Sequence, residues 1–530
     1  LKNPPCLMAI SNENSRVKKT LLNAKVNLTF YFLSLIVSFV SRKIFIDALG
    51  VEFFGLIATL QGFLGFLSLL ELGIGQSIGF ALYKPLFDND RKQINEIVSV
   101  LGYLYYIVGM IILGGGIVAS LFFPLIFAGE SHSLLLVYTL FYSFLGATLL
   151  SYFVNYRQSL LGADQRYYVV SAYTQGTSLI CTVIQIAVIF YTSNPYLWIL
   201  ISIITSIINS IFINWKINKQ YPWLQTGIRL GRQKYKDYPD IIKKTKQLFV
   251  HKIATFVQYR IQPLIMYAFA PLKSIGMYDN YSLVTARITD VVNQALNGST
   301  ASVGNLIAEG NKANILKVYW ELSSFRFLVA GVFAFCVWHL TDTFITLWLG
   351  PEMVMSNMLL ALIVANMFIR QVRNTTDMFI AGHGLFRDVW APITEMSLSV
   401  IIAVVGGIIW GLEGVLLGPL VSLIIIVGIW KPYFLFTHGI KESVWTYWFN
   451  FARYMLCFAA AFAICQFTVI ATLTINPASG FLSWIIYALI IGITFLLVYS
   501  ILLYMFSAGF SDILSRLTSM LTKNKRQTPD

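Results

Sequence analysis

Charged residues are scarce in this chain. They make up 12% of its 530 residues, whereas soluble domains carry roughly 25%. Hydrophobic residues make up 57%, and the mean hydropathy is +0.70. A surface this poor in charge cannot face water, which excludes a string of soluble domains, a disordered chain and a nucleic-acid-binding module. The composition therefore predicts an integral membrane protein that crosses the bilayer many times.

Cysteine is also scarce. The five cysteines form no CxxC pair and no cluster with histidine, which excludes a disulfide scaffold and a Cys/His metal site. We expect small buried thiols and no cofactor. No cleavable signal peptide is expected, because a polar, basic segment precedes the first apolar run and no A-x-A-like site follows it. That run is predicted to remain as a membrane-spanning helix.

Long apolar runs, by contrast, are abundant. A helix needs about 20 apolar residues to cross roughly 30 Å of hydrocarbon. The eighth run is the most polar, so it must face protein or water on one side. We predict an all-α polytopic membrane protein whose fourteen transmembrane helices span 26–46, 53–76, 97–123, 134–155, 168–191, 197–213, 248–270, 281–305, 318–340, 358–380, 392–410, 415–436, 451–473 and 481–506.

Lysine and arginine are distributed unevenly between the loops. With the N-terminus inside, cytoplasmic segments hold 27 of these residues and external loops hold three at most. Cytoplasmic loops of membrane proteins carry such an excess, so both termini are predicted to be cytoplasmic. The bias also accounts for the net charge of +14 without a nucleic-acid partner. The longest basic loop is expected to contact anionic membrane lipids, with a nucleotide or partner site as the alternative.

A weak internal repeat relates the two halves of the chain. Adding 220 to a residue number carries Leu28 to Leu248, Gly162 to Gly382 and Gln175 to Glu395. This predicts two parallel six-helix bundles, an arrangement found in transporters, plus two extra C-terminal helices. The predicted parts are a cytoplasmic N-terminal segment (1–25), the N-terminal bundle (26–213), a basic cytoplasmic connector (214–247), the C-terminal bundle (248–436), helices 13 and 14 (437–506) and a basic cytoplasmic tail (507–530).

The tenth predicted span carries a stripe of polar residues. Charges inside a membrane are costly and usually face a bundle interior or a wet cavity. Asn366, Arg370, Arg373 and Asp377 follow at i, i+4, i+7 and i+11, on one side of a helix. We interpret the stripe as cavity-lining, with Arg370 near or just below the midplane. The alternative is an internal salt bridge between Arg373 and Asp377, one turn apart.

Other spans carry comparable polar faces. The amides in helix 5 suit sugar hydroxyls or, equally, interhelical hydrogen bonds. The acids in helices 8, 10 and 11 are candidates for ion coupling, because burial could favour proton exchange. The residues concerned are Arg287, Asp290, Gln294 and Asn297 in helix 8, Gln175 and Gln185 in helix 5, Asp377 in helix 10 and Glu395 in helix 11.

Three further residues lie in or near spans. Arg42 and Arg260 occupy nearly equivalent places in helices 1 and 7, and we interpret them as a related pair of cations. Arg42 alone would be an interfacial side chain. The phrase LELGIGQSIG in the second span lacks the preceding strand of a phosphate loop, so its glycines are expected to allow close helix packing. Glu71 within it is expected to reach the inner headgroups.

The segments IFIDALGVEFFGLIATLQGFLGFLSLLELGIGQSIG (44–79) and FIAGHGLFRDVWAPITEMSLSVIIAVVGGIIWGLEGVLLGPLVSLI (379–424) resemble Wzx-like bacterial polysaccharide flippases of the multidrug/oligosaccharidyl-lipid/polysaccharide (MOP) exporter superfamily. The resemblance implies a multi-pass protein of the bacterial cytoplasmic (inner) membrane. Its substrate would be a polyprenyl-diphosphate-linked oligosaccharide, moved to the outer leaflet by alternating access for O-antigen, capsule or exopolysaccharide assembly. A glycan polymerase and assembly proteins would be its partners.

An anionic substrate agrees with the charges inside the spans. Arginine forks match phosphate oxygens and stay charged at any depth. The polar residues Asn366, Gln175, Gln185, Gln294 and Asn297 would face the cavity and its sugars. The arginines expected to bind the diphosphate are Arg370, Arg373, Arg287, Arg260 and Arg42.

Two alternatives differ in class. An ion-coupled multidrug exporter of the same superfamily usually binds cations with acids in its first bundle, and helix 1 carries none inside its span. A glycan-modifying membrane enzyme needs paired acid and base groups exposed to water. The external loops are short and contain no such pair, so the chain is not expected to be an enzyme.

The charge bias makes a direct prediction about topology. In a cysteine-free version of the protein, the single substitutions Gln233→Cys and Glu352→Cys should react with a membrane-impermeant thiol reagent from opposite sides. The thiol at position 352 is expected to label in intact cells, and the thiol at position 233 only after permeabilisation. Labelling of both from one side would contradict the fourteen-span topology.

Overall fold

The structure is a computed structural model that describes residues 26, 29–71, 73–129, 133–164, 166–256, 262–296, 303–304, 306–307, 309–385, 388 and 390–525. Throughout this part of the chain every regular element is a helix, and no strand occurs. The predicted all-α fold is therefore confirmed. Contacts divide the chain into two units, Leu1–Tyr267 with Pro271–Gly276, and Ala268–Ala270 with Met277–Asp530.

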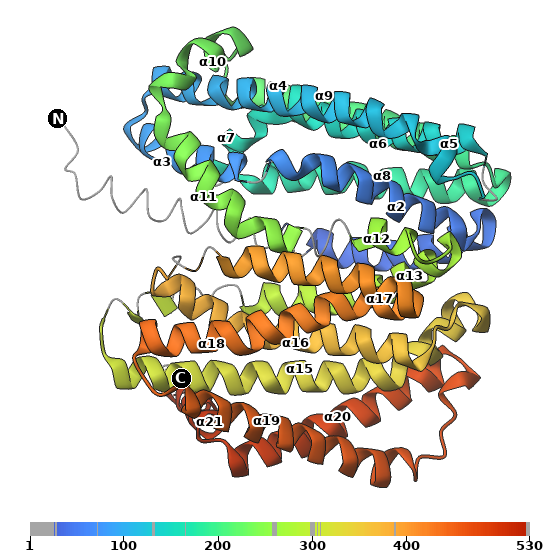
Figure 1. Cartoon of the computed structure of the whole chain (residues 1–530), viewed down its shortest axis with the longest axis vertical. Helices are drawn as coiled ribbons and strands as arrows, with labels where there is room; N and C mark the ends of the chain where they lie inside the picture. The colour runs from blue at the N-terminus through green and yellow to red at the C-terminus, as the bar shows by residue number, and fades with distance from the viewer. Residues whose placement is uncertain are drawn as a thin grey trace. The chain divides into compact units, whose positions relative to one another are not determined.

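The first unit is a bundle of long helices in mutual contact, with α4 against α6, α6 against α9, and α8 against α9 (Figure 1). One face of α4 is buried from Ile94 to Ser120, while Ile107, Ile111 and Val118 are exposed, as expected for an apolar helix that packs on one side and faces lipid on the other. The helices are a segment over 29–49, α2 (Val51–Leu67), α3 (Ile74–Asp88), α4 (Arg91–Leu121), α5 (Phe123–Ile126), α6 (Leu134–Phe153), α7 (Gln158–Ala163), α8 (Tyr167–Thr192), α9 (Pro195–Gln220), α10 (Ile228–Lys234), α11 (Pro239–Phe256) and α12 (Gln262–Tyr267).

The basic connector is fastened to the first unit. Its helix α10 packs on α4, and Glu96 of α4 accepts a hydrogen bond from Tyr238 at 2.9 Å and pairs with Lys234 at 3.5 Å. Burial, together with the nearby Glu96 carboxylate, raises the pKa of Tyr238, so its hydroxyl stays protonated and donates. Because α11 packs on α3, the division between the units falls after Tyr267 and not within 214–247.

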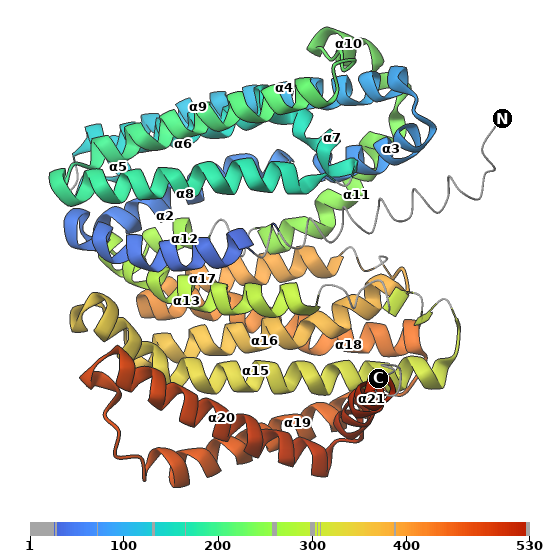
Figure 2. The ribbon, with the colours of Figure 1, turned by 180° about the vertical axis from the view of Figure 1, so that it is seen from behind.

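The second unit is built around one long central helix, α15, which contacts α16, α19, α20 and α21 (Figure 2). Its elements are most of α13 (Leu272–Leu296), α15 (Lys312–Leu349), α16 (Asn357–Gly382), α17 (Trp390–Ser422), the π-helical turn η6 (Leu423–Trp430), α18 (Lys431–Phe434), the π-helical turn η7 (Leu435–Ile440), α19 (Val444–Ile464), the π-helical turn η8 (Cys465–Ile470), α20 (Phe481–Phe506) and α21 (Ala508–Lys525).

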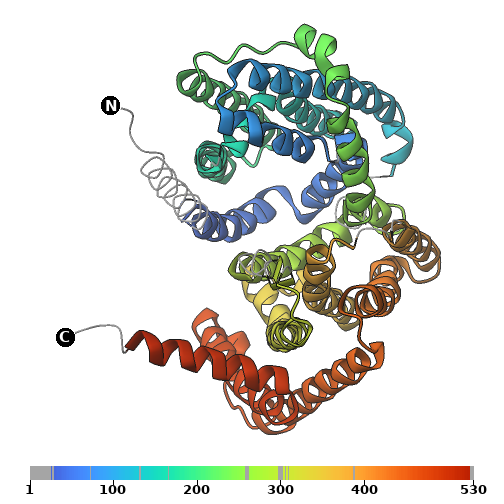
Figure 3. The same cartoon turned by 90° about the vertical axis from the view of Figure 1, so that its left-hand side faces the viewer.

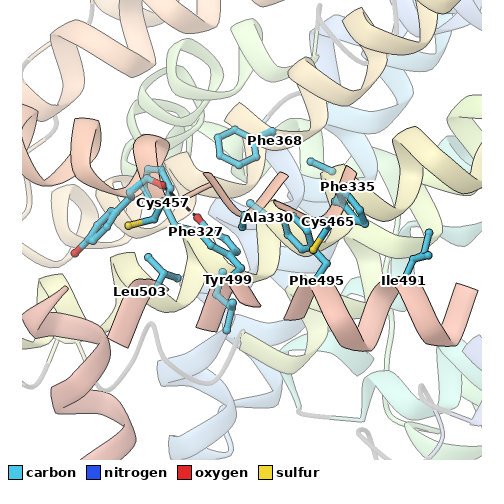
Figure 4. Close-up of a cluster of buried hydrophobic side chains, with 14 of the residues drawn as sticks. Phe327, Ala330, Phe335, Phe368, Cys457, Cys465, Ile491, Phe495, Tyr499 and Leu503 are labelled. Carbon is cyan, nitrogen blue, oxygen red and sulfur yellow. Dashed lines mark hydrogen bonds between the residues drawn. The ribbon is translucent and has the colours of Figure 1, made fainter. Parts of the chain in front are cut away.

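Aromatic side chains join α19 and α20 to α15. Phe335 of α15 stacks on Phe495 of α20 with ring centroids 4.1 Å apart, and Tyr499 is fully buried beside them (Figure 4). Inside a bilayer such rings stabilise the helix contact through van der Waals packing and ring stacking. The two helices outside the sequence repeat are thus part of the core of this unit.

Where the structure describes them, the predicted spans correspond to helices, with one interruption that the apolar pattern did not indicate. Eight helices of the described part are long and apolar enough to cross a membrane. The second span is broken between α2 and α3. The fold-back of α17 at Gly411 (φ 59°) lies between the predicted spans 392–410 and 415–436, as the sequence indicated. The seventh span includes the end of α11 and all of α12, and residues 257–261 between them lie outside the described residues. The segment expected as a basic tail forms α21, which is seen end-on in Figure 1 and lengthwise in Figure 3.

Helix α21 is anchored by a charged pair. Arg516 donates to Glu321 of α15 at 2.7 Å, and Glu321 is only 3% exposed. The backbone of Gly509 lies directly against Trp320. The tail therefore continues the fold at least as far as this helix.

The turn in α17 depends on close contact between two glycines. The arms before and after Gly411 meet at Gly406 and Gly414, and a Cβ on either residue would collide with the backbone of the other. We expect Gly414→Ala to lower the free energy of unfolding by about 1–3 kcal/mol, measured as a lower midpoint in thermal unfolding of the purified protein. Gly146→Ala is the matched control, because a Cβ there meets nothing within 4 Å. Equal midpoints for the two variants would contradict the hairpin.

Candidate functional site

Four charged side chains meet in the second unit. Arg373 of α16 donates through Nε to Asp377 Oδ2 at 2.7 Å and through a terminal guanidinium nitrogen to Glu395 Oε1 of α17 at 3.3 Å. Lys431 of α18 donates to the other Asp377 oxygen at 2.6 Å. Three segments of the chain thus contribute to one cluster, which we call the charge cluster.

Local helix geometry brings Lys431 into this cluster. The helix that carries it is π-helical on both sides, in η6 and η7, and π-turns change the direction in which the following side chains project. Pro432 follows directly and lacks a backbone N–H. The indole N–H of Trp430, the residue before Lys431, donates to Asp388 at 3.3 Å. This hydrogen bond holds the start of α18 in place.

The charge cluster is electrically balanced and mostly buried. It contains two cations and two carboxylates, with side-chain exposures of 16% for Arg373, 15% for Lys431, 31% for Asp377 and 3% for Glu395. Charges taken out of water are costly unless they are paired and hydrogen-bonded. Removing one member should therefore strand another.

The other two residues of the polar stripe, Asn366 and Arg370, also lie on α16, nearer its Asn357 end. Asn366 donates to the carbonyls of Leu362 and Leu416, at 2.9 and 3.3 Å, and so links α16 to the second arm of α17. Arg370 is half-buried one turn before the charge cluster. The salt bridge between Arg373 and Asp377 that the spacing allowed is present, and it belongs to the larger cluster.

Two intramembrane cations that contact α16 were not singled out by the sequence. Lys431 lies near the end of the twelfth predicted span, where lysine side chains ordinarily extend to the headgroups. Arg326 of α15 is 8% exposed and donates to Gln371 of α16 at 3.4 Å. Its position inside the ninth span was the available signal, because buried ionisable residues mark functional sites.

The other candidate residues have surroundings of their own. Arg42 is 9% exposed and covers the ring of Phe54 at 4.1 Å. Gln185 donates to the Trp198 carbonyl at 2.9 Å and to Ser202 at 2.7 Å, which is the interhelical bonding that the sequence left open. Arg287 and Gln175 are half-buried and Asp290 is exposed. Outside the described residues or side chains lie Arg260, Gln294 and Asn297.

A metal centre finds no support in the described residues, among which no group of three or more His, Cys, Asp or Glu side chains could hold an ion. The carboxylates of the charge cluster are occupied by cationic side chains. The arrangement is suited to exchange of ionic partners.

No protein-family profile matches the chain, and no curated protein matches it. Two solved structures share its fold. An inward-facing multidrug resistance MATE family transporter of the MOP superfamily aligns with a TM-score of 0.60 at 13% identity, over 79% of this chain and 99% of that one. The lipid II flippase MurJ, in an inward closed conformation, aligns with a TM-score of 0.59 at 15% identity, over 91% and 99%. The chain therefore shares the fold of these two proteins.

The geometry of the charge cluster predicts an order of stability among variants. Asp377→Asn leaves Lys431 without its carboxylate and should cost about 3–5 kcal/mol. The double variant Asp377→Asn/Lys431→Met should recover part of that loss, because Arg373 and Glu395 remain as a neutral pair. Thermal unfolding of the purified variants measures both effects.

The control for this series is Glu413→Gln, whose carboxylate accepts from Ser356 at the turn of α17 and is half-buried. It should leave the unfolding midpoint unchanged. A double variant less stable than Asp377→Asn alone would show that Lys431 is not held by Asp377.

Proposed function

We propose that the protein is a flippase that moves a polyprenyl-diphosphate-linked oligosaccharide from the inner to the outer leaflet of a bacterial cytoplasmic membrane. The observation that carries this proposal is the sign of the intramembrane charges in the second unit. In the predicted spans of this unit the basic residues outnumber the acids: they are Arg287, Arg326, Arg370, Arg373, Lys431 and Arg453, against Asp290, Glu321, Asp377 and Glu395. Such an excess of cations favours an anionic substrate.

The charge cluster provides a way to bind a diphosphate and to release it. Guanidinium groups bind phosphate oxygens through two parallel hydrogen bonds. Because Arg373 and Lys431 are already paired, an incoming diphosphate would displace Asp377 or Glu395. The displaced carboxylates would compete for the same cations and limit the affinity. A transporter needs this balance, since a substrate bound too tightly cannot leave.

The depth of the cluster suits a substrate that enters from the cytoplasm. Asp377 lies five residues before the end of α16 at Gly382, or about 8 Å along the helix axis, and this end is cytoplasmic in our topology. Arg370 lies about 10 Å further in. A diphosphate headgroup would meet the charge cluster first and Arg370 next. We expect Arg287, Arg260 and Arg42 to contact it at later stages.

The sugar part would need hydroxyl-binding groups. Gln175 is half-buried on α8 and available for this role, as is Asn366 through its amide oxygen. O-antigen, capsule and exopolysaccharide units are all compatible with such groups.

A multidrug exporter has the same fold and is the main rival. Exporters of cationic drugs require acids that are free to bind a cation, whereas Asp377 and Glu395 each pair with a basic side chain. An enzyme would need a water-exposed acid and base, and we propose none. The charges thus favour the flippase.

Arg370 provides the sharpest functional test. Arg370→Ala should abolish surface glycan display in a strain that lacks the flippase gene, at normal membrane abundance. Arg370→Lys should retain part of the display, because it keeps the charge but loses the two-pronged fork. Immunoblots of membranes and whole-cell glycan staining measure the two quantities.

Arg373→Ala serves as the comparison, because it strands Asp377 and Glu395 and should lower abundance as well as display. Full display by Arg370→Ala at normal abundance would remove Arg370 from the substrate site. Loss of the protein from the membrane in both alanine variants would show that the polar residues of α16 have a structural role.

A further inference from the structure

A half-buried carboxylate lies at a break in the second span. α2 ends at Leu67, a short 3-10 helix, η1, covers Ser68–Glu71, and Gly73 has a left-handed backbone (φ 94°) before α3 begins at Ile74. Transporter helices that are interrupted in this way commonly carry their ion sites at the break. The sequence alone had assigned Glu71 to the headgroups.

Two tyrosines hold this carboxylate. Tyr105 of α4 donates to Glu71 Oε1 at 3.1 Å, and Tyr152 of α6 donates to Oε2. Both rings are buried, at 8% and 3% exposure, and meet edge to face with centroids 5.3 Å apart. Three elements of the first unit thus converge on one carboxyl group.

The position of Tyr105 shows how deep the site is. It lies halfway along α4, a helix of 31 residues that is about 47 Å long. The carboxyl group is held inside the bundle by two buried side chains, whereas contact with headgroups would leave it open to the interface. The expectation that Glu71 reaches the headgroups is therefore wrong.

The partners of Glu71 are neutral. Within the described part of the chain no lysine, arginine or histidine pairs with it, whereas Asp377, Glu395 and Glu321 all pair with basic side chains. The Lys244 side chain of α11 lies over the ring of Phe80, which follows Glu71 by nine residues in the sequence. The described residues of α7 and α12 include no charged side chain. Tyr105 and Tyr152 are the titratable groups that face it.

We propose that Glu71, Tyr105 and Tyr152 form a proton-binding site in the first unit. When Glu71 is ionised, both hydroxyls donate to it, as observed. When a proton binds one carboxylate oxygen, the adjacent tyrosine hydroxyl rotates and accepts it, and the site becomes neutral. A proton is favoured over Na⁺ because it needs only one carboxylate oxygen, whereas a metal cation takes several oxygen ligands.

Protonation would change how the break is held. The ionised carboxylate draws α4 and α6 to η1 through two charge-assisted hydrogen bonds, and the neutral acid makes weaker ones. The second span would therefore be held more firmly when Glu71 is ionised than when it is protonated. The consequence for transport rests on the proposed function: proton binding at Glu71 would supply the energy that drives the flippase cycle.

Infrared difference spectroscopy of the purified full-length protein between acidic and neutral pH tests the site directly. The carbonyl band of one protonated carboxyl group should be lost in Glu71→Gln and kept in Glu52→Gln, a control at the start of α2. Tyr152→Phe should raise the titration midpoint of that band by about 1–2 pH units, because a hydrogen bond to the charged form contributes about 1.5–3 kcal/mol. A purely structural tyrosine would leave the midpoint unchanged.

Three outcomes would overturn the inference. The same band in wild type and Glu71→Gln would show that Glu71 does not titrate. A midpoint that falls in NaCl but not in KCl would assign the site to Na⁺. In liposomes, gradient-driven movement of the diphosphate-linked lipid by Glu71→Gln at the wild-type rate would remove Glu71 from coupling. Wild-type protein that moves no such lipid in any gradient would instead defeat the proposed function and leave the infrared result standing.

Discussion

Hydrocarbon offers no water to pair with a charge, so every ionised side chain inside the bundle must find its partners in the protein. The second unit meets this constraint with opposite charges: Arg373 and Lys431 share Asp377 and Glu395. The first unit meets it with neutral donors, because Glu71 accepts from two tyrosines. Both sites lie where a helix departs from regular geometry, at π-turns in one case and at a break in the other.

These two solutions suit different tasks. A balanced set of four charges can exchange one ionic partner for another with little change in total energy, which suits reversible binding of a diphosphate. A lone carboxylate among hydroxyls changes its own charge when a proton arrives, which suits coupling to a gradient. If substrate and proton bind at separate sites, each can shift the same conformational equilibrium, and their binding is then coupled.

The sequence predicted much of the fold and only part of the site. Apolar length located the helices, because crossing the bilayer imposes a length that composition reveals. Helical spacing also found Arg373 and Asp377, which are neighbours on one turn. Lys431 and Arg326 were missed, since their partners come from other helices and no spacing rule reports such contacts. Glu71 was misplaced because its apolar surroundings conceal a break that depends on the backbone of Gly73 and on tyrosines 34 and 81 residues away.

The most direct measurement of the central claim is transport by purified protein in liposomes, with a fluorescent polyprenyl-diphosphate oligosaccharide and a cationic dye offered separately. The charges of the second unit predict that the diphosphate-linked lipid crosses the bilayer and becomes accessible to an external quencher, while the dye does not move. Export of the dye down a proton gradient, with no crossing of the lipid, would contradict the flippase and identify a multidrug exporter.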